Sequence, residues 1–204
     1  SGDPPLFDQG SLDVVEALDR CGRVEREERV SYYTVPHAVS VGGTYGDFVT
    51  LAPPLDRENP QLTIDCAIDF KTHIGQQRIV FPVCEELMRM ASVARTNTSW
   101  AKVLYCRTIG RLFADVRNLG YTSQNVLSAG RNRYMNEPRL VHEGKALEAV
   151  WHRSVLDLLA AIALIPNGQF VGHITSYKAG HRLDCELMRQ LYLNEVLVPL
   201  ELGE

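Results

Sequence analysis

The stretch LTIDCAIDFK, residues 62–71, decides the fold class of this chain. Its apolar residues recur at positions 62, 64, 66, 68 and 70, while Thr, Asp, Ala, Asp and Lys occupy the positions between them. Successive side chains of a β-strand point to opposite faces, so this alternation predicts a strand with one buried face and one solvated face. Gly75 then turns the chain into residues 78–81, which we expect to pair with this strand as a hairpin.

The β pattern extends back from this strand to Val30. Residues 30–35 alternate in the same way, glycines at 42, 43 and 46 supply turns, and residues 48–51 form a short apolar run. The sequence therefore predicts a mainly antiparallel sheet in the N-terminal half, at about residues 30–81.

After Pro82 the apolar period becomes helical. The spacing predicts helices over 83–94, 99–119, 143–164 and 183–196, with a strand over 169–177 and a polar, irregular segment over 121–139. A short helix is also expected after Ser11, a good N-cap. The fold class is therefore α+β, with the sheet packed against a helical C-terminal half. We expect a loose arm at 1–10 and a single domain at 11–204, with a subdivision near residue 82 as the alternative.

Positive charge concentrates in the middle of the chain. Residues 95–139 hold eight basic and two acidic side chains, a formal charge of +6, whereas the whole chain has a formal charge of −4. This polarity favours a surface for an anionic partner. The residues predicted to bind that partner are Arg107, Arg111, Arg117, Arg131, Arg133, Tyr134 and Arg139. The alternative is a solvated helix face and loop, neutralised by acidic residues elsewhere in the fold.

Known catalytic motifs are absent from the sequence. It contains no G-x-S-x-G, P-loop, H-E-x-x-H or G-x-G-x-x-G pattern. His173 and His181 have no third ligand at a supporting spacing, so no metal or other cofactor is predicted. The five cysteines form no C-x-x-C pair, which favours an intracellular, reducing compartment, either cytoplasm or nucleus. No apolar run approaches the length of a membrane-spanning helix, about 20 residues.

Three hypotheses follow for function, and the first favours a protein that is not an enzyme. In this hypothesis the chain is a self-associating interaction or assembly protein, as small viral structural proteins are. Its Arg-rich segment 95–139 binds an acidic protein. The second is an RNA- or DNA-binding protein that uses the same segment. The third is a small hydrolase whose polar side chains converge in three dimensions. The residues of that convergent site are Asp65, Asp69, His73 and His173. Self-association through the apolar C-terminal helix predicts a homo-oligomer.

Overall fold

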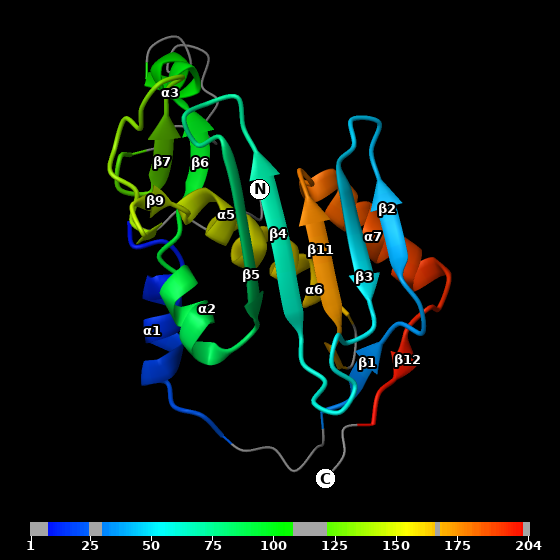
Figure 1. Ribbon diagram of the computed structural model, residues 1–204. Coiled ribbons are helices and arrows are strands. Elements are labelled where there is room, and N and C mark those ends of the chain that lie inside the picture. The colour runs from blue at the N-terminus through cyan, green and yellow to red at the C-terminus, as the bar shows by residue number, and fades with distance from the viewer. Residues whose placement is uncertain (1–7, 25–29, 108–121, 166–167, 202–204) are drawn as a thin grey trace.

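A computed structural model describes residues 8–24, 30–107, 122–165 and 168–201. Its centre is a five-stranded sheet in the order β2-β3-β11-β4-β5 (Figure 1). The strands are β2 (Val39–Gly42), β3 (Phe48–Ala52), β11 (His173–Tyr177), β4 (Thr63–Asp69) and β5 (Gln76–Pro82). The order places β11, which is late in the sequence, between two early strands.

Strand β4 behaves as its alternation predicts. Ile64, Cys66 and Ile68 are buried, and the residues between them are half-exposed. β5 pairs antiparallel with β4 from Thr63↔Pro82 to Asp69↔Gln76, so the expected hairpin is confirmed. The α+β fold class is also confirmed. The parallel pairing of β11 with β4 is a feature that the sequence did not reveal.

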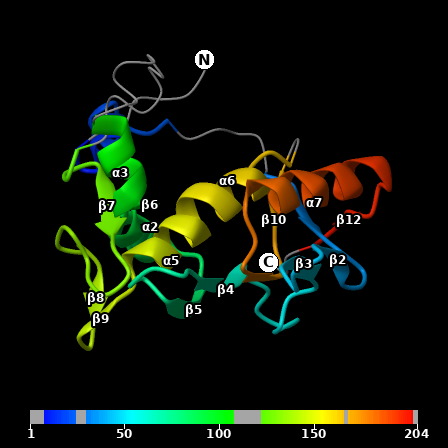
Figure 2. The same ribbon diagram turned by 90° about the horizontal axis from the view of Figure 1, so that it is seen from above.

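Helices cover one face of the sheet, as Figures 1 and 2 show. One continuous helical segment consists of α5 (Glu148–His152), the π-helix η2 (Arg153–Leu158) and α6 (Leu159–Ile162). The other covering helix is α7 (His181–Leu193). Leu158, Leu183 and Leu187 are buried against the sheet residues Leu51, Ile64 and Ile174 in one hydrophobic cluster. Apolar burial of this kind is the main stabilising contribution to such a fold.

The remaining elements lie around this core. A small sheet combines β10 (Gln169–Phe170), β1 (Tyr32–Thr34) and β12 (Val198–Pro199). The parallel pair β6 (Thr96–Ser99) and β7 (Val126–Ala129) is joined through α3 (Trp100–Arg107). Helices α1 (Leu12–Arg20) and α2 (Glu85–Ala91) lie side by side, and β8 (Val141–His142) forms a hairpin with β9 (Lys145–Ala146). No helix in the described ranges has the length and apolar character needed to cross a bilayer.

Two sequence predictions need correction. The segment 121–139 is not wholly irregular, because β7 lies within it and all four of its residues are buried. The helix predicted over 143–164 begins only at Glu148, after the β8–β9 hairpin, and changes to a π-helix midway. Most of the arm predicted at residues 1–10 lies outside the described residues, and the domain boundaries stay a prediction.

Candidate functional site

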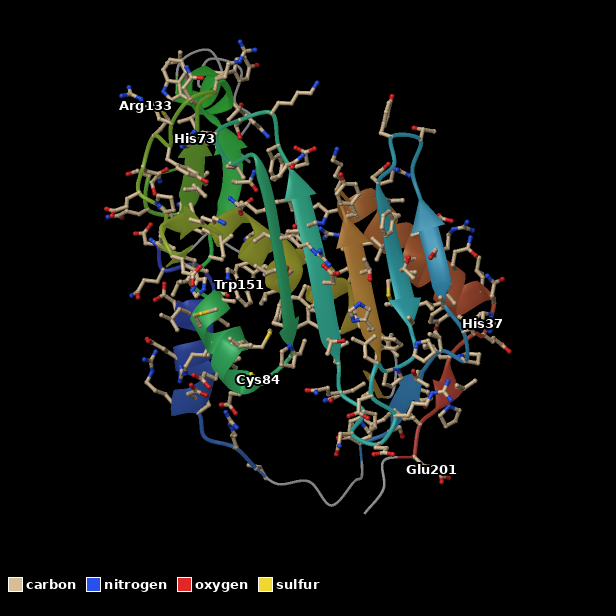
Figure 3. All side chains as sticks on the ribbon, viewed as in Figure 1. His37, His73, Cys84, Arg133, Trp151 and Glu201 are labelled. Carbon is tan, nitrogen blue, oxygen red and sulfur yellow. The ribbon has the colours of Figure 1, made fainter. Side chains whose placement is uncertain are left out.

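The Arg-rich segment is only partly described. Arg111 and Arg117 lie outside the described residues, as does the side chain of Arg107 at the end of α3. Arg131 and Arg133 are exposed in the loop after β7, and Figure 3 shows Arg133 at the edge of the molecule near β7. Their predicted role in binding a partner stays a prediction.

Tyr134 and Arg139 make contacts within the fold. The Tyr134 ring packs edge-on against His73, with ring centroids 5.0 Å apart, and its hydroxyl accepts a hydrogen bond from Gln77. Burial raises the pKa of the Tyr134 hydroxyl. The Arg139 guanidinium donates to the backbone carbonyls of Val93, Asp8 and Gln124. Both side chains therefore hold loops in place.

Arg95 is buried and neutralised. Its guanidinium is 4% exposed and donates to both carboxylate oxygens of Glu148, at 2.7 and 3.0 Å. Glu148 is completely buried and also accepts hydrogen bonds from the backbone amides of Arg95 and Arg139. The first positive charge of the Arg-rich segment is thus neutralised by a carboxylate from another element, as the alternative interpretation of this segment predicts.

The four polar residues of the hydrolase hypothesis do not gather into one group, although Asp65 and His173 interact electrostatically across the paired strands β4 and β11. Asp65 and Asp69 each form their own ion pair, and Arg78 lowers the pKa of the Asp65 carboxyl. His173 shares a hydrogen bond with Thr63 across neighbouring strands, at 2.7 Å. His73, whose ring contact is described above, lies near β6 and β7 (Figure 3). Each side chain has a local partner, and the structure does not bring all four together, so this residue assignment stays a prediction.

A different set of titratable side chains meets on the helical layer. The Asp157 carboxylate oxygen Oδ1 lies 3.5 Å from His152 Nε2 and 4.0 Å from His181 Nε2. His152 and Asp157 come from the helical segment of α5 and η2, and His181 is the first residue of α7. We call these three residues the His–Asp–His cluster. One carboxylate between two imidazoles can orient both rings and stabilise a proton on either of them.

The π-helix explains how His152 and Asp157 come together. In an α-helix of 3.6 residues per turn, residues five apart are rotated by about 140° relative to each other. A π-helix closes each turn between residues i and i+5, so residues five apart lie on the same side. Because η2 begins directly after His152, Asp157 is brought back beneath the imidazole. A π-turn inside an α-helix is frequently found at a functional site.

The two histidines have different environments. His152 is largely buried, and this burial lowers its pKa below the ordinary value of 6.5, although Asp157 opposes the shift. Its Nδ1 atom is also buried, and the backbone of Ala94 lies close to the imidazole. His181 is 80% exposed and follows Gly180, the N-cap of α7. The cluster thus combines an inner, largely buried imidazole with an outer one that is open to solvent.

Comparison with known proteins identifies the family. Residues 1–193 match the LpxC family, described as UDP-3-O-acyl N-acetylglycosamine deacetylase. The chain belongs to the LpxC family. Among its relatives, the UDP-3-O-acyl-N-acetylglucosamine deacetylases of Brucella ovis and Brucella melitensis are each 29% identical to it over 197 residues. These alignments cover 94% of this chain and 62% of each relative, so the chain spans less than two thirds of their length.

Membership of the LpxC family corrects the leading functional hypothesis. The hypothesis of a non-catalytic, viral-like assembly protein is wrong, because the family and the Brucella relatives are named as deacetylases. The same finding overturns the prediction that the chain is not an enzyme, and it removes the support for RNA or DNA binding.

The sequence patterns do not single out His152 or Asp157, and they indicate no third metal ligand for His181. Asp157 is the only charged residue between Ser154 and Ile165 in an otherwise apolar stretch, and His152 stands five residues before it. That isolated carboxylate was the available clue. A spacing of five does not match an α-helical face, so the pattern alone did not pair the two residues.

Proposed function

We propose that this protein hydrolyses the acetamido group of a UDP-3-O-acyl-N-acetylglucosamine, with the His–Asp–His cluster as its reactive centre. The observation that carries the proposal is the convergence of His152, Asp157 and His181 from two separate helical segments. Membership of a deacetylase family supports the reaction class. Because the chain spans 62% of the length of its relatives, activity and substrate are both part of the proposal.

The reaction requires water to add to the amide carbonyl and the C–N bond to break, which releases acetate and a free amine. The leaving nitrogen must receive a proton as the bond breaks. His181 is the exposed member of the cluster, so we assign it as the group that meets the substrate, takes a proton from the attacking water and passes it to the leaving nitrogen. Asp157, 4.0 Å away, stabilises the protonated imidazole.

His152 holds Asp157 from the inner side. Its lowered pKa keeps the imidazole neutral near pH 7, so it can share a hydrogen with the carboxylate without adding a buried charge. The arrangement of an exposed histidine, a carboxylate and a buried support follows the general logic of a base oriented by a third group.

Histidine and aspartate also bind catalytic divalent cations, which usually take three protein ligands in such sites. Within the described residues, no group of three or more His, Cys, Asp or Glu side chains is arranged to hold a metal ion.

The direct test is release of acetate from UDP-3-O-acyl-N-acetylglucosamine by the purified protein. We expect Asp157→Asn, which keeps the shape but removes the charge, to lower kcat by about 10²- to 10⁴-fold, the usual contribution of acid–base catalysis. The control is His142→Ala, because His142 is exposed on β8 and lies outside the cluster. Equal rates for wild type and Asp157→Asn, or no acetate release by the wild type, would contradict the proposal.

Two earlier expectations are carried forward as predictions. The described cysteines Cys21, Cys66, Cys84 and Cys185 are free thiols, in keeping with the predicted reducing, intracellular location. Self-association also stays a prediction. Its proposed surface is reduced, however, because Leu183, Leu187 and Leu191 of α7 are buried in the core of their own chain. Tyr192 and Leu193 are the exposed apolar residues at the end of this helix.

A further inference from the structure

A buried ion pair joins the two helical segments that carry the cluster. Arg153 donates to both carboxylate oxygens of Asp184, at 2.6 and 2.5 Å. The side chains are 7% and 3% exposed, so the pair is almost wholly removed from water. A third, longer contact of 3.4 Å links the same guanidinium to Ser176 Oγ on β11.

The position of this pair relates it to the cluster. Arg153 directly follows His152 at the start of η2, and Asp184 lies three residues after His181 in the first turn of α7. Residues three apart on a helix are neighbours on its surface. The pair therefore connects the turn that carries His152 and Asp157 to the turn that carries His181.

Stability alone is a poor explanation for this pair. Removing two charges from water is costly, and well-packed apolar residues of similar volume often stabilise a fold as well or better. Here Arg153 Nε is also buried without a hydrogen-bond partner among the described residues, which adds to the cost. Apolar packing does not fix the relative orientation of the two helical segments. Two parallel hydrogen bonds between a planar guanidinium and a carboxylate fix both the distance and the angle between their carriers.

We infer that the Arg153–Asp184 pair is a positioning device that sets His181 over Asp157. Arg153 acts from η2, where its guanidinium also lies 4.0 Å from the second oxygen of Asp157. Neither residue contacts the reacting atoms in this assignment. The catalytic consequence of the inference rests on the proposed function, but the geometric part does not.

Two variants separate positioning from folding. Asp184→Asn keeps the shape of the side chain and removes its charge. The double variant Arg153→Met/Asp184→Leu replaces the whole pair with apolar residues of similar volume, so the fold is expected to remain cooperative. The matched control is Glu186→Gln, because Glu186 forms an exposed ion pair with Arg189 on the same helix.

The first readout is the NMR spectrum of the His181 imidazole, which needs no substrate. In the double variant, we expect the His181 ring signals to move toward those of the exposed His142, while Glu186→Gln leaves them in place. The second readout is the deacetylase assay. Loss of alignment is expected to lower kcat by roughly 10- to 100-fold with KM little changed, because misplacement acts on the transition state.

Wild-type His181 signals in a folded double variant would overturn the inference. Unfolding of both variants would also overturn it, since the pair would then serve the fold alone. If the wild type releases no acetate, the proposed function fails, while the NMR comparison still decides whether the pair positions His181.

Discussion

Burial of the His152 imidazole makes the stability of the fold depend on pH. The unfolded chain binds a proton at His152 below about pH 6.5, whereas burial lowers the pKa in the folded chain. Between these two values the unfolded state binds more protons, so the free energy of unfolding falls as the pH falls. The slope is at most about 1.4 kcal/mol per pH unit for one proton.

Urea denaturation between pH 8 and pH 5, in buffer with a chelator, measures this dependence. We expect His152→Gln to flatten the profile below pH 6.5, because the variant has no imidazole to protonate. His142→Gln is the control, since His142 is 76% exposed and lies outside the cluster. An unchanged slope in His152→Gln would show that this imidazole does not contribute.

At the scale of elements, the π-helix η2 is the feature that makes the cluster. Relative to an α-helix, it accommodates one extra residue within the turn that spans Arg153–Leu158. Deleting Ser154 would leave His152 and the aspartate four residues apart, a spacing at which α-helical side chains are neighbours. We therefore expect the deletion variant to fold with an ordinary α-helix and to retain most of the proposed deacetylase activity.

The comparison variant for this deletion carries one added alanine after Ser154. Six residues would then separate the two side chains, and neither an α-turn nor a π-turn brings such a pair together. We expect this insertion to abolish activity at the level of Asp157→Asn. Circular dichroism would confirm that both variants stay helical, and equal activity losses in the two variants would contradict the role given to η2.

Elements whose apolar residues recur at a clear spacing could be predicted from the sequence, and elements without such a spacing could not. The alternation at residues 62–70 predicts both β4 and its buried face, and β5 follows from the turn at Gly75. Strand β7 was missed because all four of its residues are buried and so show no alternation. The cluster was missed because a π-turn leaves no mark in an α-helical period. The sequence also did not reveal that β11, which precedes α7 and its His181, pairs parallel with β4.

At the scale of the molecule, the buried ion pairs and the partly exposed His–Asp–His cluster occupy different places in the fold. Arg95 with Glu148 and Arg153 with Asp184 are buried ion pairs that tie distant segments together. The Arg-rich segment looked like one surface in the sequence because a formal charge total ignores such pairing. The partly exposed Asp157 lies on the helical layer with a histidine on either side and with the Arg153 guanidinium 4.0 Å away.

The central claim is that His152, Asp157 and His181 act as one unit, and a double-mutant comparison of Asp157→Asn and His181→Ala tests it most directly. Residues that act as a unit give strongly non-additive losses of kcat. We predict that the double variant releases acetate at about the rate of the slower single variant. Losses that multiply, so that each substitution costs the same factor whether or not the other is present, would contradict the account.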